Sequence, residues 1–314
     1  MSKFPDLIIN DGLVLSRRGK KNPVDTQKPY AWMIEKELSS SGSIEDVAII
    51  FLTNNECPFR CLMCDLWKNT TDERVMAGSI PRQIELALNE LPAAMNLKLY
   101  NSGSFFDPNA IPVEDYVNIA SMVKSFKTVI VESHPKFIGT KCLNFRNLLK
   151  TDLHVALGLE TVHPDLLDKL NKKMTLKDFS RAVKFLSRNE IQSRAFVLLK
   201  PPFLSEEEGI LWAEKSIEFA FSEGIECCTV IPVRPGNGAM DELMENGYFA
   251  PPRISSLEKV LEYGINLKAG RVFADTWDLK LFSGCDKCID ERTSRIIEMN
   301  LSQKIYPSVK CSCK

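Results

Sequence analysis

Three cysteines within eight residues carry the strongest chemical signal in the sequence. Cys57, Cys61 and Cys64 have the spacing C-x3-C-x2-C in the segment CPFRCLMC. Three thiolates on one loop can bind three irons of a cubane iron–sulfur cluster and leave the fourth iron open to a small molecule. The alternatives are inert thiols or a zinc site, but closed zinc sites take four ligands and no fourth cysteine lies nearby.

A second cysteine group lies near the C-terminus, in GCDKC and CSC. Its four thiols suit either a structural zinc ion or a second [4Fe–4S] cluster, and the spacing does not choose between them. A helix-like stretch, residues 292–301, would bring the two halves together. We expect one metal centre that fixes the tail, with these ligands: Cys285, Cys288, Cys311 and Cys313.

The elements that position the first cysteine loop alternate between short apolar segments and helix-like stretches. Candidate strands are residues 47–52, 97–100, 128–132, 154–159, 194–199 and 227–231. Capping boxes begin two of the helices, Thr175 with Asp178 and Ser205 with Glu208. This alternation predicts an α/β fold with parallel strands, and it fits both a doubly wound sheet and a barrel. The cysteine loop follows the first strand, so it lies at the carboxyl edge of the sheet.

The cysteine spacing resembles the radical S-adenosylmethionine (SAM) superfamily, whose motif is C-x3-C-x-Φ-C. Met63 occupies the Φ position, which is usually aromatic, and a methionine can still contact an adenine ring. The resemblance implies a partial (β/α)6 TIM-like barrel over residues 46–270. Residues 1–45 would form an N-terminal extension and residues 271–314 a Cys-rich C-terminal segment.

The same resemblance implies a chemistry. SAM would bind the open iron of a [4Fe–4S] cluster through its amino and carboxylate groups. An electron from a reductase, flavodoxin or ferredoxin would then cleave SAM to methionine and a 5′-deoxyadenosyl radical, which abstracts hydrogen from the substrate.

Polar residues that end the predicted strands are candidates for binding SAM. Asn101, Ser102 and Gly103 follow the second strand, where the family has a Gly-Gly-Glu-type turn that holds the SAM amino group. Glu132 ends the third strand and Glu160 the fourth, where carboxylates can accept hydrogen bonds from ribose hydroxyls or the SAM amine. A common small-residue turn and salt-bridged or capping glutamates are the alternatives.

Three further residues are candidates for contacting substrate, although a structural role is as well supported for each. His134 lies just beyond the third strand, Lys200 ends the fifth strand, and Arg234 follows the sixth.

Several longer segments together resemble the archaeosine-forming radical SAM lyase subunit, a family close to the elongator catalytic subunit. They are VESHPKFI, GLETVHPDLLDKLNKKMT, LLKPPFLSEEE and YFAPP. The resemblance implies a partner transferase and a lyase that cleaves a lysine adduct on a 7-deazaguanine base of tRNA. A radical SAM enzyme of small-molecule or natural-product metabolism is the first alternative, and a non-catalytic metal-binding protein is the second.

The composition of the chain excludes several classes of protein. The 314 residues include 40 Lys and Arg against 41 Asp and Glu, so the chain as a whole is not a basic nucleic-acid binder. We interpret a local basic run as a solvated loop: Arg17, Arg18, Lys20 and Lys21. The run would favour RNA as the substrate if it faced the barrel mouth. No apolar run approaches the ~20 residues of a membrane span, and no secretory signal is visible. We therefore expect a cytoplasmic protein with no membrane association.

Overall fold

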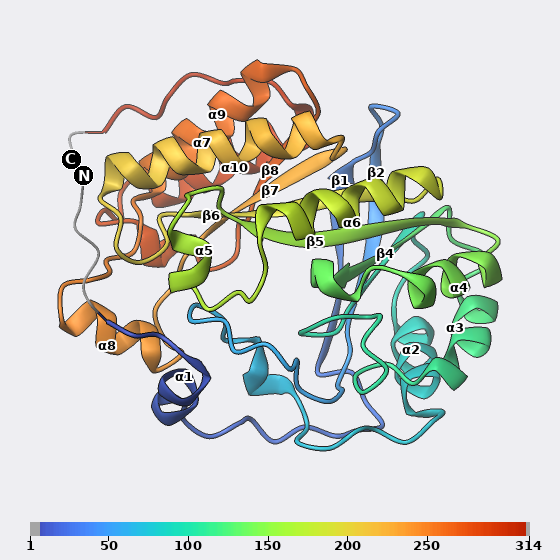
Figure 1. Cartoon of the computed structure of the whole chain (residues 1–314). Coiled ribbons are helices and arrows are strands. Elements are labelled where there is room, and N and C mark those ends of the chain that lie inside the picture. Colours follow the sequence, from blue (N-terminus) through green and yellow to red (C-terminus); the bar gives the residue numbers. More distant parts are fainter. Residues whose placement is uncertain (1–6, 312–314) are drawn as a thin grey trace.

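Eight strands form a single sheet in residues 7–311, the part of the chain that this computed structural model describes (Figure 1). The strands follow one another in chain order. β1 pairs with β2 in antiparallel fashion, and every later pair is parallel. Their bounds are β1 Ala31–Leu38, β2 Ile44–Phe51, β3 Asn96–Tyr100, β4 Thr128–Ser133, β5 Asp152–Glu160, β6 Gln192–Leu199, β7 Cys227–Pro232 and β8 Arg271–Ala274.

This strand order decides between the two architectures. A doubly wound sheet reverses its winding, so its first strand lies in the interior of the sheet. Here each strand pairs with the next in the chain, as in a barrel wound in one direction. The protein is therefore a partial TIM-like barrel, as predicted, and the sheet curls through the molecule in Figure 1.

All six predicted strands are present, as β2 to β7. The sequence reading missed β1 and β8, which add one strand to each edge of the sheet. β1 carries the charged run Glu35–Glu37, and its residues alternate irregularly between partly buried and exposed. β8 is four residues long. The sheet thus begins within residues 1–45 and ends within residues 271–314.

Helices cross between the parallel strands, and the predicted capping boxes begin α6 and α7. None of the described helices is long and apolar enough to cross a membrane. The α-helices are α1 Asp11–Arg17, α2 Ser79–Glu90, α3 Tyr116–Met122, α4 Thr140–Leu148, α5 Leu166–Lys169, α6 Leu176–Arg188, α7 Glu206–Glu223, α8 Ala239–Glu245, α9 Ile254–Leu267 and α10 Ile289–Ser302. Short 3-10 helices are η1 Leu66–Asn69, η2 Val113–Asp115, η3 Pro135–Phe137 and η4 Leu279–Phe282.

The last helix covers the open side of the barrel. α10 packs against both edge strands, β1 and β8. Two amide side chains at its C-terminal end bond to the backbone of β8 as a neighbouring strand would. Asn300 accepts from the N–H of Ala274 (2.9 Å) and donates to its carbonyl (2.8 Å), and Gln303 makes the same pair of bonds to Val272 (2.8 Å each). α10 thereby protects an edge that would otherwise expose unpaired backbone groups.

Buried charges link β1 to the strands across the barrel, near the N-terminal ends of the parallel strands. Glu37 lies 2.7 Å from Arg194 and 2.7 Å from Lys98, and Lys98 also pairs with Glu35. Burial alone would raise the pKa of Glu37, but the charges of Arg194 and Lys98 outweigh it and hold that pKa well below its usual range. This end of the barrel is therefore closed by mutually compensated charges.

Candidate cluster and SAM site

The cysteine loop, residues 57–64, follows β2 at the carboxyl edge of the sheet, where α/β barrels carry their active sites. Cys61 is buried, and Cys57 and Cys64 are partly exposed. Burial raises the pKa of Cys57 and Cys64 to about 12 and that of Cys61 to about 11, and the neighbouring thiols add to each shift. Thiols in such a site become thiolates when a bound metal compensates their charge.

Two asparagine side chains from distant segments hold the backbone of this loop. Asn237 donates to the carbonyl oxygens of Leu62 (2.7 Å) and Cys64 (3.1 Å). Asn171 donates to the carbonyl of Arg60 (2.7 Å). Both asparagines are buried. Sequence analysis did not single them out, and the Gly-rich segment around Asn237 was the one visible signal.

Two residues of the N-terminal basic run, Arg18 and Lys21, fold onto the cysteine loop, so the expectation of a solvated loop is wrong for them, whereas Arg17 and Lys20 are exposed. Arg18 and Lys21 both pair with Glu56, the residue before Cys57, at 2.5 and 2.8 Å. Arg17 pairs with Glu242 on α8. The Arg18 side chain is only 7% exposed. These charges are compensated within the protein, and they brace the loop instead of forming a basic face.

His134 supports the cysteine loop through its ring. It stacks on Phe59, a residue of the loop, with a centroid distance of 3.8 Å. Its Nδ1 accepts from the backbone N–H of Lys136 (3.2 Å), so its Nε2 carries the proton and donates to the carbonyl of Lys172 (3.0 Å). Burial lowers the pKa of His134 to about 3, which keeps the ring neutral. These contacts give it a positioning role, and its contact with substrate stays a prediction.

The turn after β3 packs against the cysteine loop and contains an unpaired amide. A Cβ at Gly103 would lie 3.3 Å from the Cβ of Cys57. Glu132 accepts hydrogen bonds from the backbone N–H groups of Asn101 (2.7 Å) and Gly103 (3.4 Å), so it fixes the turn. The side chain of Asn101 is completely buried, yet neither its oxygen nor its nitrogen has a partner within residues 7–311. Buried polar groups are normally paired, so this amide is able to bind a polar group of a ligand.

Other contacts complete the turn. The Ser102 hydroxyl lies 2.9 Å from the Tyr30 hydroxyl, and the Ser102 backbone has a positive φ of 53°. Burial raises the pKa of Glu132 to about 7, against the opposing effect of its backbone donors.

Glu160 forms a buried ion pair close to the cysteines. Its carboxylate lies 2.5 Å from the ammonium group of Lys172, a residue that sequence analysis did not single out. Both charges influence the pKa of Cys61. The backbone of Glu160 has a φ of 66°, and a Cβ at Gly158 would collide with both members of the pair. Backbone strain of this kind is commonly found at functional sites.

The remaining candidates have structural partners. Lys200 pairs with Glu206 at 2.7 Å, and Arg234 pairs with Asp275 at 2.6 Å. Met63 packs against a small apolar cluster that includes Val14 and Leu62. The predicted substrate contacts of Lys200 and Arg234 and the adenine contact of Met63 stay predictions.

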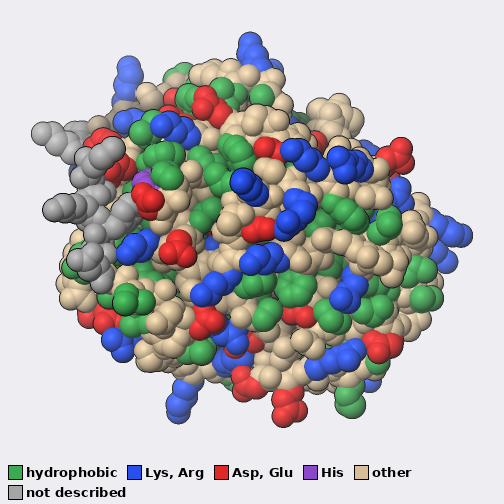
Figure 2. Space-filling view, in the orientation of Figure 1, with side chains coloured by type: hydrophobic (Ala, Val, Ile, Leu, Met, Phe, Trp, Pro, Cys, Tyr) green, Lys and Arg blue, Asp and Glu red, His purple; other side chains and the backbone are tan. Residues whose placement is uncertain are grey.

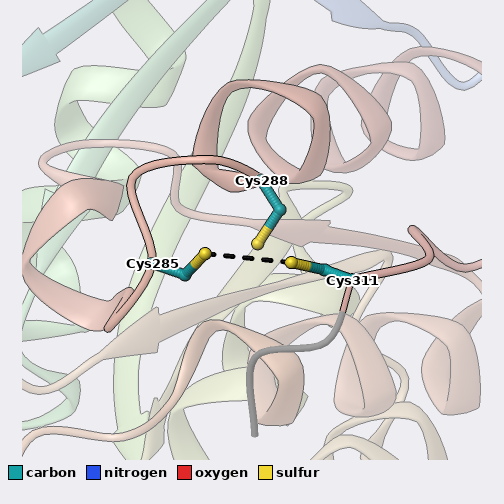
Figure 3. A group of neighbouring side chains, drawn as sticks. All are labelled: Cys285, Cys288 and Cys311. Carbon is teal, nitrogen blue, oxygen red and sulfur yellow. Dashed lines mark hydrogen bonds between the residues drawn. The ribbon is translucent and has the colours of Figure 1, made fainter.

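At the C-terminus, three of the four predicted metal ligands lie together. The sulfur atoms of Cys285, Cys288 and Cys311 are all within 4.8 Å of one another and point toward a common centre (Figure 3). Cys313 lies outside the described residues. The three cysteines that belong to neither group are buried: Cys142, Cys227 and Cys228.

The residues around the cysteine loop fit a [4Fe–4S] cluster that carries SAM. One loop supplies three thiols for three irons. Beside it, the unpaired amide of Asn101 offers a donor and an acceptor to a polar group such as the amino-acid end of SAM. Gly103 keeps the turn close to Cys57.

Comparison with solved structures agrees with the fold. Over 70% of the chain it matches the archaeal Elp3 of Methanocaldococcus infernus, with a TM-score of 0.52, 14% identity and 59% of that chain covered. It matches methylornithine synthase with a TM-score of 0.50 and 16% identity, over 70% of this chain and 63% of that one. The fold is therefore similar to the folds of these two proteins, and it agrees with the partial TIM-like barrel expected from the sequence.

Sequence comparison adds relatives, although no family model matches the chain. An uncharacterized protein of Methanocaldococcus jannaschii is 27% identical, over 98% of this chain and 92% of its own length. Archaeosine synthase subunit beta of Methanosarcina acetivorans is 26% identical, over 79% of this chain and 75% of its own length. The chain is thus similar to the subunit family that its longer segments resemble.

Proposed function

We propose that the chain is a radical SAM enzyme. Cys57, Cys61 and Cys64 would hold the [4Fe–4S] cluster, and the turn at residues 101–103 would hold SAM. The unpaired, buried amide of Asn101 beside the cysteine loop carries this proposal. When bound, the cluster and SAM supply a radical that abstracts a hydrogen atom, with the electron from a reductase, flavodoxin or ferredoxin.

The substrate we propose is a modified tRNA base, a 7-deazaguanine adduct that the enzyme cleaves as a lyase together with a partner subunit. The similarity to archaeosine synthase subunit beta supports this substrate, and a subunit name implies an assembly. If so, the near-neutral chain needs a local surface that binds RNA phosphates.

The surface that we propose for this contact lies on α6 and just before it. Five exposed cations, which we call the α6 stripe, recur at intervals of three or four residues: Lys173, which precedes the helix, and Lys177, Arg181, Lys184 and Arg188 on one face of it. Asp178 is the one acidic residue in α6. In Figure 2, Lys and Arg side chains spread across the middle of the face that carries α6.

The stripe also leads to the candidate site. Lys173 directly follows Lys172, the partner of Glu160, and α6 packs against η3, the element that follows His134. A polyanion bound along α6 would therefore reach the carboxyl edge of the barrel, where the cysteine loop lies.

SAM cleavage tests the first part of the proposal. Reconstituted, reduced protein should convert SAM to 5′-deoxyadenosine, and a variant with Cys57, Cys61 and Cys64 changed to alanine should lose that activity together with about four irons per chain. Unchanged iron and unchanged SAM cleavage in this variant would refute the cluster assignment.

The α6 stripe tests the second part. Lys177→Glu, Arg181→Glu and Lys184→Glu together should weaken tRNA binding and reduce its salt dependence by about one unit of log–log slope per lost phosphate contact. A matched triple reversal on other exposed lysines, Lys259→Glu, Lys268→Glu and Lys280→Glu, should bind like wild type. Equal losses in both variants would mean that only net charge matters, and SAM cleavage without any tRNA binding would favour a small-molecule substrate.

A further inference from the structure

The spacing of the C-terminal sulfur atoms distinguishes between the two metals that their sequence allows. We propose that Cys285, Cys288 and Cys311 bind one tetrahedral zinc ion and no second iron–sulfur cluster. Cys313, which lies outside the described residues, stays the fourth ligand predicted from the sequence. This proposal is independent of the function proposed above.

The distances favour a single ion. The Sγ atoms of Cys285 and Cys311 lie 3.8 Å apart. Two thiolates on one tetrahedral ion, with Zn–S bonds of about 2.3 Å, lie roughly 3.8 Å apart. In a cubane cluster each thiolate binds a different iron at an outer corner, so the sulfurs must be farther from one another. All three described sulfurs lie within 4.8 Å, which leaves room for an ion but not for a cube of irons and sulfides.

The local structure prepares the site for negatively charged sulfur. Cys288 is the N-cap residue of α10, where the helix dipole stabilises a thiolate. Its Sγ also accepts a hydrogen bond from Nε of Arg292 (3.4 Å). On the other side, the backbone N–H of Cys285 donates to the Ser283 hydroxyl (3.2 Å), which in turn donates to the Cys285 carbonyl (3.1 Å). These two hydrogen bonds hold the loop that carries Cys285.

A buried arginine brings Cys311 back to the other two ligands. Arg295 on α10 donates to the carbonyls of Tyr306 (2.6 Å) and Pro307 (2.9 Å). It is itself held by Glu258 (3.0 Å) and Glu262 (2.5 Å) on α9. Residues 303–311 have no regular secondary structure, so this anchor and the ion together would fix the tail.

The ion would therefore have a structural role at the open side of the barrel. It would link the two ends of α10, because it would be bound by Cys288 at the start of the helix and by Cys311 in the tail that follows the helix. α10 is also the helix that packs against both edge strands of the sheet. Metal-binding energy becomes folding energy for the segment it joins, so zinc would hold α10 in place across the gap.

Metal analysis of the full-length, reconstituted protein tests the proposal. We expect about one zinc and about four irons per chain, and zinc-edge X-ray absorption should show four sulfurs at about 2.3 Å. Cys288→Ala should lose zinc and keep the iron, whereas the triple alanine variant of Cys57, Cys61 and Cys64 should do the reverse. Cys142→Ala, a buried cysteine of neither group, should keep both metals.

Three results would overturn the proposal. One is about four further irons per chain that disappear in Cys288→Ala, because they would identify a second cluster. Another is a Cys285–Cys311 disulfide in freshly purified protein, and the third is wild-type protein without zinc. If Cys288→Ala fails to fold, zinc can be replaced by cobalt in the wild-type chain. Four thiolate ligands give a tetrahedral cobalt spectrum with strong sulfur-to-metal charge transfer, and this spectrum would decide the question. A cobalt form without that spectrum also counts against it.

Discussion

Two largely buried polar side chains, Glu37 and Asn101, lie near opposite ends of the sheet and are held in different ways. Near the N-terminal ends of the parallel strands, Glu37 meets Arg194 and Lys98, and the charges compensate one another inside the protein. At the carboxyl ends, Glu160 and Lys172 also form a buried ion pair, but the side-chain amide of Asn101 has no partner among the described residues. The same strands connect both ends, so the difference does not come from the fold.

This difference distinguishes residues that are needed for stability from residues that are available for binding a ligand. A buried charge that loses its partner is costly, so the pairs around Glu37 must remain intact for the barrel to fold. An unpaired buried amide already carries that cost in the protein alone, and a ligand that pairs with it recovers the energy. We therefore expect Glu37 and its partners to matter for stability, and Asn101 to matter for ligand binding.

The largest expected effect is near the N-terminal ends of the parallel strands. Glu37→Ala should destabilise the protein by about 3–5 kcal/mol, because Arg194 and Lys98 remain buried without their shared carboxylate. Urea unfolding measures this loss. Lys36→Ala on the same strand is the matched control: its ion pair with Asp46 is between exposed side chains and should be worth less than about 1 kcal/mol. Equal losses in the two variants would remove the basis of the comparison.

The two ends of β3 offer a smaller and more direct test. The side chain of Asn96, at its start, donates to Glu45 (2.8 Å), whereas the side chain of Asn101, after its end, has no partner in the part of the chain that is described. Asn96→Ala should cost about 1 kcal/mol of stability and leave SAM affinity unchanged. Asn101→Ala should change stability less but weaken SAM binding about tenfold, the equivalent of ~1.4 kcal/mol. Calorimetric SAM titration of both variants decides this. Loss of affinity in Asn96→Ala, or none in Asn101→Ala, would contradict it.

Much of the fold could be predicted from the sequence because buried parallel strands are apolar on both faces. β2 to β7 have this pattern and were found. β1 was missed because it directs charged side chains into the barrel. Glu35 and Glu37 are stable there because they pair with Lys98, a residue of another strand, β3. β8 was missed because four residues are too few to show a period.

The candidate site divides in the same way. Spacing alone identified the cysteines, and the positions of Asn101, Glu132 and Glu160 followed from where the strands end. Asn171 and Asn237 could not be found, because each contacts the cysteine loop from more than a hundred residues away. The basic run was misread for the same reason: its partner Glu56 lies in a different segment, and sequence gives no indication of their pairing.

The last test concerns pH, where the contributions of Glu37 and Glu132 to stability should have opposite signs. The pKa of Glu37 in the folded protein lies well below its ordinary value of 4.5, so its stabilisation is present above about pH 4.5 and is lost as the pH falls. The pKa of Glu132 is raised to about 7, so between pH 4.5 and pH 7 the folded state binds the extra proton and stability declines as the pH rises.

Glutamine variants isolate the two contributions. In protein without cluster, Glu37→Gln should flatten the loss of stability on the acid side, and Glu132→Gln should remove the decline toward pH 7. Each variant can change the slope of the unfolding free energy against pH by at most the equivalent of one proton. Urea unfolding at a series of pH values measures both slopes. If the two variants change the curve in the same pH window, Glu37 and Glu132 share one kind of environment and the two ends of the barrel do not differ in the way proposed.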